Sequence, residues 1–229
     1  MTDLSYVLPL KSRPGDGDAG ELTDYLSWLA DRAEVLVVDG SEDAAFAAHR
    51  DAWAGVGLRH VRPDRTRVAN GKVGGVLTGV RLAEHDRVVI ADDDVRYDEV
   101  ALERIGGLLD EAELVRPQNY FDPVPWHARW DTARIVLNRA GGHDYPGTLG
   151  VRREFLRSIG GYDGNVLFEN LELIRTVRAA GGRVFEAPDL FVRRLPPTFS
   201  RFLEQRPRQA YDDWAQPLRF AAFLLIGPA

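Results

Sequence analysis

The chain of 229 residues contains no cysteine. Disulfide bonds and thiolate sites for zinc or iron–sulfur clusters are therefore excluded. The sequence also has no apolar run of the roughly 20 residues that a membrane span needs. Its first residues, MTDLSYVLPLKSRP, lack the basic start and long apolar core of a secretory signal. We therefore expect a cytoplasmic protein.

An excess of positive charge is missing as well. The formal net charge is −6, and 28% of the residues are charged. This balance argues against a protein whose main work is to coat nucleic acid, so we expect no nucleic-acid partner. The hydrophobic content of 45% supports a substantial core.

The longest apolar stretch is FAAFLLIGPA at residues 220–229, about half the length of a membrane span. It is compatible with a final helix that packs on the core. Peripheral contact with the inner face of a membrane, or part of a membrane span, is the alternative. The sequence leaves both interpretations open.

Apolar runs alternate with helical patterns in the first half of the chain. Strands are predicted at residues 5–10, 33–40 and 86–91, with a short one in GLRHVRP and others in AELVRP and GRVFEA; helices are predicted near 20–32, 71–83, 98–110 and 169–180 and in EDAAFAAHRDAW. Continuous apolar strands between helices predict an α/β fold with a mostly parallel central sheet, flanked by helices. No repeat or linker divides the chain. We predict one domain, with a nucleotide-binding half at 1–116 and an acceptor-binding half at 117–229.

Three adjacent carboxylates, Asp92, Asp93 and Asp94, follow the apolar run RVVIA. In open parallel sheets, ligands bind beyond the carboxyl ends of the strands. A divalent cation makes several carboxylates tolerable there, and Mg²⁺ and Mn²⁺ prefer oxygen ligands. A solvated turn that caps the next helix is the plain alternative.

Two further features lie near predicted strand ends or helix starts. Asp39 closes the strand in VVDGSED, and Lys72 opens a helix in NGKVGG, where a cation can meet phosphate beside helix N-terminal amides. The order of these pieces resembles the family 2 glycosyltransferases, which have the GT-A (nucleotide-diphospho-sugar transferase) fold. The resemblance runs through YVLPL, VLVVDGSED, NGKVGGVLTG, VVIADDDV, GTLGVRREFLRSIGGYDGNVLFENLELIRTVRAAGG and QRPRQ, which together span about residues 5 to 208.

The resemblance implies a nucleotide site on the first half. Pro9 and Leu10 would lie beside the nucleotide base, and Asp39 would contact the base or the ribose. Lys72 would lie near the base or the diphosphate of a UDP-type or GDP-type sugar donor.

The resemblance also implies a metal site that binds Mn²⁺ or Mg²⁺. Asp92 and Asp94 are the outer members of the Asp-x-Asp motif, and Asp94 is the first choice for direct coordination. Asp93 would face the ribose and the metal.

The acceptor side departs from the family pattern. Inverting members carry Glu-Asp at the start of a helix, where the Asp is the general base, but here Glu169 and Asn170 stand at those positions. An amide cannot take up a proton at neutral pH. Glu169 is the nearest substitute, and Glu172 is a second candidate. A different base, a retaining mechanism, loss of activity and plain helix-start acids remain open.

The segment EQRPRQ resembles the Gln-x-x-Arg-Trp motif of processive and lipid-acceptor members. Gln205 and Arg208 match, whereas Gln209 stands where tryptophan is expected. Arg206 and Arg208 would bind the diphosphate or an anionic acceptor, or form a solvated face.

Two tryptophans, Trp126 and Trp130, lie four residues apart and share a face if the segment is helical. Their indole rings would suit a pocket for a sugar, lipid or small-molecule acceptor; core packing is the alternative. His143 is a candidate metal ligand or base.

The sequence therefore predicts a metal-dependent, inverting glycosyltransferase. A nucleotidyltransferase of similar fold is the first alternative, because LPLKSRPGDGDAG has glycine and basic residues after the first strand. A catalytically silent module that binds nucleotide sugars is the second, because of Asn170 and Gln209.

Overall fold

The computed structural model describes residues 3–12, 19–64, 69–140, 146–166 and 168–214, except for the side chains of 19, 208, 209 and 211–214. Its strands are β1 (Leu4–Leu10), β2 (Glu34–Asp39), β3 (Arg59–Val61), β4 (Arg87–Ala91), β5 (Val95–Arg96), β6 (Leu114–Phe121), β7 (Thr148–Arg152) and β8 (Val184–Arg194). Its helices are α1 (Ala19–Ala30), α2 (Asp43–Ala52), α3 (Gly71–Leu82), α4 (Glu99–Leu108), α5 (Trp126–Ala140), α6 (Arg153–Ser158), α7 (Glu169–Ala179) and α8 (Phe199–Trp214).

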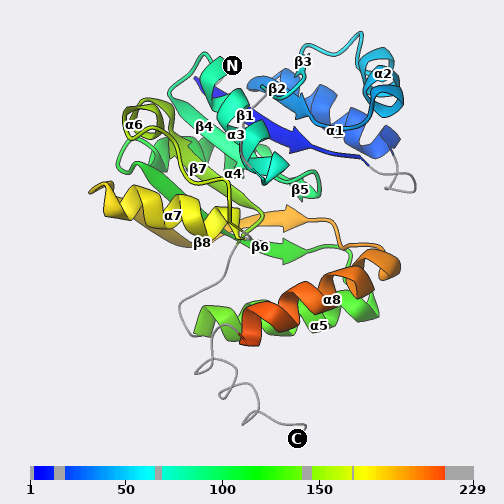
Figure 1. The fold of residues 1–229 in the computed structure, drawn as a ribbon, viewed down its shortest axis with the longest axis vertical. Coiled ribbons are helices and arrows are strands. Elements are labelled where there is room, and N and C mark those ends of the chain that lie inside the picture. Colours follow the sequence, from blue (N-terminus) through cyan, green and yellow to red (C-terminus); the bar gives the residue numbers. More distant parts are fainter. Residues whose placement is uncertain (1–2, 13–18, 65–68, 141–145, 167, 215–229) are drawn as a thin grey trace, which may run out of the picture.

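The strands form one sheet in the order β3-β2-β1-β4-β7-β6-β8-β5 (Figure 1). β1 pairs in parallel with β2 and β4, β2 with β3, and β6 with β8. β7 is antiparallel to β4 and β6, and β5 is antiparallel to β8. The strand directions confirm the prediction of an α/β fold with a mostly parallel central sheet.

The predicted elements of the first half are confirmed, and the second half holds more strand than predicted. β8 continues to Arg194, well beyond the predicted GRVFEA, and β6 continues to Phe121 past a register shift between Arg116 and Gln118. Pro117 and Pro188 lie inside these strands. Because proline interrupts a strand pattern, the sequence made both strands look shorter than they are.

Hydrophobic side chains cover both faces of the sheet. On β1, Tyr6 and Leu8 point into a core that includes Leu26 of α1 and Ile105 of α4. Val7 points to the opposite face, into a core that includes side chains of α3, α6, α7 and β7. The alternation of side chains along the strand thus gives the two-sided packing that a sheet between helices requires.

Helix α3 packs closely on β1, and this contact positions Lys72. A Cβ atom at Gly79 would lie 2.3 Å from Cγ1 of Val7, so only glycine allows the present separation. The helix begins at Gly71, where the Asn70 side chain accepts a hydrogen bond from the Lys72 amide at 3.0 Å. Lys72 is therefore held in the first turn of α3, beside the sheet.

Helices α5 and α8 form a separate layer beyond β6 and β8 (Figure 1). Arg206 of α8 forms an ion pair with Asp131 of α5 at 2.7 Å, and His127 shares a hydrogen bond with the Pro197 carbonyl at 2.9 Å. Within the described residues, none of the helices has the length and apolar character to cross a membrane.

Candidate active site

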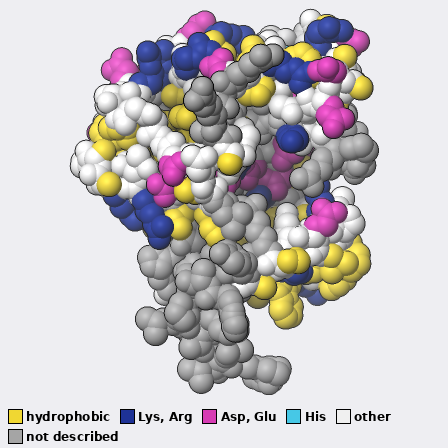
Figure 2. All heavy atoms as spheres, in the orientation of Figure 1, with side chains coloured by type: hydrophobic (Ala, Val, Ile, Leu, Met, Phe, Trp, Pro, Cys, Tyr) yellow, Lys and Arg dark blue, Asp and Glu magenta, His cyan; other side chains and the backbone are white. Residues whose placement is uncertain are grey.

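The carboxyl ends of the parallel strands bring several predicted site residues to one edge of the sheet. β1 ends at Leu10, β2 at Asp39 and β4 at Ala91, and Asp92 follows at once. The Asp92 amide donates to the Gly147 carbonyl at 2.9 Å, which fixes the chain where it leaves β4. On the face shown in Figure 2, acidic side chains are visible in a hollow of the surface.

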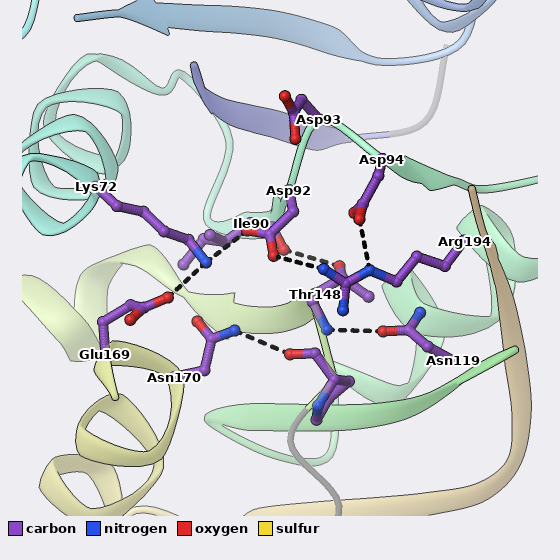
Figure 3. A network of polar contacts seen from close by, with 12 residues as sticks. Lys72, Ile90, Asp92, Asp93, Asp94, Asn119, Thr148, Glu169, Asn170 and Arg194 are labelled. Atoms are coloured by element: carbon purple, nitrogen blue, oxygen red, sulfur yellow. Dashed lines mark hydrogen bonds and ion pairs between the residues drawn. The ribbon is translucent and has the colours of Figure 1, made fainter. Parts of the chain in front are cut away.

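Lys72 joins two acidic side chains that are distant in the sequence. Its Nζ atom lies 2.5 Å from Oδ1 of Asp92 and 2.7 Å from Oε1 of Glu169 (Figure 3). Glu169 is the first residue of α7 and its side chain is only 12% exposed. The structure therefore brings together the predicted lysine, one predicted metal ligand and the predicted base.

Arg194 is a site residue that the sequence analysis missed. Its Nε atom donates to Oδ2 of Asp94 at 2.8 Å, and its Nη2 atom donates to Oδ2 of Asp92 at 3.4 Å (Figure 3). It is the last residue of β8, whose end lies beside β5. The sequence does contain a signal, the adjacent pair Arg193 and Arg194. The strand predicted in GRVFEA ended before this pair, so the pair was not placed at a strand end.

Mutual repulsion and burial perturb the aspartates. Burial, together with the charges of Asp94 and Asp92, raises the pKa of Asp93 to about 6. Burial also raises the pKa of Asp94, although the charge of Arg194 opposes the shift. Its Oδ1 atom is buried and has no hydrogen-bond partner among the described residues. This carboxylate oxygen could therefore coordinate a cation.

The two bases of the cluster stay positively charged. Burial alone would lower the pKa of Lys72, but the charges of Asp92 and Glu169 raise it above its ordinary value. In the same way, Asp94 and Asp92 outweigh burial and raise the pKa of Arg194. Three carboxylates (Asp92, Asp94 and Glu169) contact the two cations directly, and Asp93 adds a fourth negative charge that Arg201 and Arg194 offset in part. A site so rich in carboxylates fits a divalent ion.

A hydrogen-bonded scaffold supports the cluster from below. Thr148 Oγ1 donates to the Ile90 carbonyl at 2.8 Å, and the Gly147 amide donates to Oδ1 of Asn119 at 2.7 Å (Figure 3). Asn170 donates from Nδ2 to the Pro146 carbonyl at 2.9 Å. The side chain of Asn170, which replaces the expected aspartate, therefore acts as a donor that fixes the segment before β7.

Asp39 lies at the predicted edge but is fully buried. Oδ1 accepts from the Ser41 amide at 2.8 Å, and Oδ2 lies 2.7 Å from Nδ1 of His49 and 3.0 Å from Nε2 of His60. Burial alone would raise the pKa of Asp39, but these hydrogen bonds lower it below its ordinary value. The three ligand-type groups also lie within 4.8 Å of one another, and hydrogen bonds already account for their grouping.

Pro9 and Leu10 are the last two residues of β1. They pair with Val38 and Asp39 of β2, and the Leu10 carbonyl accepts a hydrogen bond from the Gly40 amide at 2.8 Å. The end of β1 and the Asp39 turn are therefore joined directly.

The remaining predicted residues lie apart from the carboxylate cluster or outside the description. The described side-chain hydrogen bond of Glu172 comes from Thr176 in the same helix, at 3.5 Å. Gln205 is exposed on α8, and Arg206 pairs with Asp131. The side chain of Arg208 and the whole of His143 lie outside the described residues.

The two tryptophans line a groove between α5 and α8. The groove encloses about 560 Å³ and is lined by Trp126, Arg129, Trp130, Ala133, Phe202 and Arg206. The indole side chains of Trp126 and Trp130 are 67% and 69% exposed, so they are not core residues. Arg206 lies over the Phe202 ring at 3.9 Å, which adds a cation–π contact to the groove.

Residues 30–212 match the model of a protein family described as glycosyltransferase like family 2. No curated protein sequence matches this chain closely enough to count as a relative.

Solved structures show the fold. The mannosyltransferase PcManGT from Pyrobaculum calidifontis, in complex with GDP-Man and Mn²⁺, is 20% identical, with a TM-score of 0.67 over 99% of this chain. This chain spans 65% of that protein's length. Glucosyl-3-phosphoglycerate synthase from Mycobacterium tuberculosis, in complex with Mn²⁺, UDP and phosphoglyceric acid, is 20% identical, with a TM-score of 0.57 over 86% of this chain and 72% of that one. TarS residues 1–349 from S. aureus is 15% identical, with a TM-score of 0.56 over 84% of this chain and 60% of that one.

Proposed function

The chain belongs to the glycosyltransferase like family 2, and on this premise we propose that it transfers a sugar from a nucleoside diphosphate sugar to an acceptor hydroxyl. The observation that carries the proposal is the cluster at the end of β4. There three carboxylates, Asp92, Asp94 and Glu169, contact two cations at the edge where an open sheet binds its ligands. Structural neighbours with the same fold bind GDP-Man or UDP together with Mn²⁺.

Asp92 and Asp94 are the residues that would hold Mn²⁺ or Mg²⁺. They come from one chain turn, and the unpartnered Oδ1 of Asp94 offers a carboxylate oxygen, the ligand type that these ions prefer. When bound, the ion supplies positive charge that neutralises the diphosphate leaving group. Asp93 stands between the two ligands in the sequence and would face the ribose and the metal. In Figure 3 its side chain points away from those of Asp92 and Asp94.

The donor lies over the ends of β1 and β2. Pro9 and Leu10 flank the base, and Asp39 contacts the base or ribose. Because the Asp39 carboxylate is fully buried and already accepts three hydrogen bonds, a contact with the base or ribose would require one of these hydrogen bonds to open. Lys72, at the start of α3, balances the charge of the diphosphate.

Glu169 is the proposed general base of an inverting transfer. It is the acidic residue of α7 that reaches the cluster, through Lys72, whereas the described contact of Glu172 lies within α7. Glu169 would take the proton from the acceptor hydroxyl as that oxygen attacks the anomeric carbon. Glu172 remains the second candidate for this role.

The acceptor side is the layer of α5 and α8. The groove with Trp126 and Trp130 offers indole faces, which pack against sugars or lipid chains. Arg206 lines the groove and Gln205 precedes it on α8, so both are candidates to bind an anionic acceptor or the diphosphate. Arg208, whose side chain lies outside the described residues, is the third candidate. Peripheral membrane contact belongs to residues 220–229, which lie outside the described part of the chain.

A silent nucleotide-sugar-binding module is the second candidate function. The observation in its favour is Asn170, whose amide serves as a structural donor at the position of the expected base. The two candidates differ in turnover and agree in donor binding.

The test is a titration of the wild type and Asp94→Ala with UDP and GDP sugars, with and without Mn²⁺. The wild type should bind one donor in a Mn²⁺-dependent way and release the nucleoside diphosphate. Asp94→Ala should lose that dependence, because one of the two metal ligands is gone. Its turnover should also fall, because a bound metal supplies several kcal/mol of transition-state stabilisation. Circular dichroism checks that the variant is folded. Donor binding without turnover would favour the silent module, and an Asp94→Ala protein that behaves like the parent would refute the metal assignment.

A further inference from the structure

Arg194 spans the two predicted metal ligands. Its guanidinium contacts Asp94 through Nε at 2.8 Å and Asp92 through Nη2 at 3.4 Å. Both contacts are made to Oδ2 atoms, so a divalent ion that bridged the two carboxylates through these oxygens would compete with the guanidinium for them. In the structure, the guanidinium therefore supplies the positive charge at the place proposed for the metal.

The backbone of Arg194 is fixed, while its side chain has access to solvent. Val95 pairs with Arg194 across β5 and β8, and the Arg194 carbonyl accepts from the Asp122 amide at 3.1 Å. The side chain is 25% exposed. The sheet thus holds the backbone of Arg194, and the exposed part of its side chain leaves the guanidinium a way toward solvent.

Gly147 provides the space in which the guanidinium lies. A Cβ atom at this position would come within 3.0 Å of Cζ of Arg194 and of Oδ2 of Asp92. Any larger residue would therefore press on both partners of the contact. Glycine at this position is therefore compatible with the contact between Arg194 and Asp92.

We infer that Arg194 is the cation that the divalent metal displaces from Asp92 and Asp94, and that the released guanidinium binds the diphosphate of the donor. This inference rests on the proposed function, because it assumes that a metal and a nucleoside diphosphate bind at this site. Guanidinium forks match phosphate oxygens as well as carboxylates, so one side chain can serve both states. Arg194 then weakens the binding of the metal alone and strengthens the binding of the diphosphate once the metal is present.

The inference predicts two effects of opposite sign for Arg194→Met. Mn²⁺ alone should bind more tightly than to the wild type by about tenfold or more, because the ion no longer competes with a hydrogen-bonded charge. UDP or GDP in the presence of saturating Mn²⁺ should bind more weakly by about tenfold or more, because a charged phosphate contact is lost. Isothermal titration calorimetry measures both constants without reference to activity.

Arg193→Met is the matched control. Arg193 precedes Arg194 on β8, is 40% exposed, and pairs with Asp122 at 3.3 Å rather than with the cluster. The Arg193→Met substitution removes the same charge outside the cluster. Its dissociation constants for Mn²⁺ and for the nucleoside diphosphate should therefore match those of the wild type. Arg194→Gln, which keeps a hydrogen-bond donor without the charge, should shift both constants in the same directions and replaces Arg194→Met if that variant does not fold.

Equal or weaker Mn²⁺ binding by the Arg194 variants would overturn the inference, and so would unchanged diphosphate binding. Identical effects in Arg193→Met would also overturn it, because net charge alone would then explain them. A wild type that binds neither Mn²⁺ nor a nucleoside diphosphate would instead refute the proposed function, and the inference with it. The two failures are distinguishable because one appears in the variants and the other in the parent.

Discussion

At the scale of single residues, the site is a balance of charges held by distant segments. Lys72 links Asp92 to Glu169, and Arg194 links Asp92 to Asp94. Lys72 and Glu169 are 97 residues apart in the sequence, and Arg194 and Asp92 are 102 residues apart. Each carboxylate that pairs with Lys72 or Arg194 is only partly exposed. Because few water molecules screen the charges there, the loss of one group should be felt by all the others.

The role of Glu169 is tested by Glu169→Gln. Glutamine keeps an oxygen that can accept from Lys72 but cannot take up a proton, so donor affinity should change little. Positioned proton transfer typically accelerates a step by about 10² to 10⁴, and turnover should fall by that order. Steady-state kinetics and donor titration measure the two quantities.

Glu172→Gln separates the two candidates. If the loss of turnover appears in that variant and not in Glu169→Gln, the base is Glu172. A product that keeps the anomeric configuration of the donor would exclude an inverting base altogether. Asn170→Asp is a poor restoration test, because aspartate cannot donate to the Pro146 carbonyl as Asn170 does.

At the scale of elements, close packing of α3 on β1 sets the position of Lys72. Val7 is fully buried in the middle of β1, and a Cβ atom at Gly79 would lie 2.3 Å from its Cγ1 atom. Val7 is stiff about χ1 and cannot turn away easily. The helix would have to move instead.

Gly79→Ala should therefore destabilise the protein. Overpacking typically costs about 1–3 kcal/mol, which exceeds the helix-propensity gain of up to about 1 kcal/mol from alanine. Gly107→Ala in α4 is the control, because a Cβ atom there has nothing within 4 Å. It should leave stability equal or higher. Urea unfolding measures both, and an unfolding midpoint for Gly79→Ala at or above that of the parent would contradict the packing argument.

The sequence predicted the elements whose signals are local. The apolar runs of β1, β2 and β4 and the 3.6-residue spacing of α3 mark themselves, and so does the Asp-x-Asp motif after β4. β8 was predicted too short because Pro188 and its charged neighbours hide a strand whose pairing comes from β6 and β5. Arg194 was missed for the same reason: its role depends on register with Val95, and no local pattern encodes that register.

At the scale of the whole molecule, one sheet joins the two predicted halves, and the site lies across their junction. β4 of the first half pairs with β7 of the second, and β5 pairs with β8. Asp92 and Asp94 come from the first half, whereas Glu169 and Arg194 come from the second. Strands of the two predicted halves pair with each other, so residue 116 does not divide the sheet. That the first half binds the nucleotide and the second half the acceptor stays a prediction.

The pH dependence of unfolding is a property of the whole molecule to which Asp39 should contribute measurably. Hydrogen bonds from Ser41, His49 and His60 outweigh burial and lower the pKa of Asp39 in the folded protein. A carboxyl group with a lowered folded-state pKa stabilises the fold above its unfolded-state pKa of about 3.9 and loses that contribution as the pH falls below it.

Asp39→Asn, which does not titrate, should therefore lose less stability between about pH 5 and pH 3 than the parent does. At pH 7 the variant should be less stable by about 1–3 kcal/mol, because a buried charged acceptor is removed from its donors. Urea unfolding across this pH range gives both curves, with Asp51→Asn as an exposed control that should follow the parent. Parallel curves for Asp39→Asn and the parent would show that the buried carboxylate contributes nothing to acid stability.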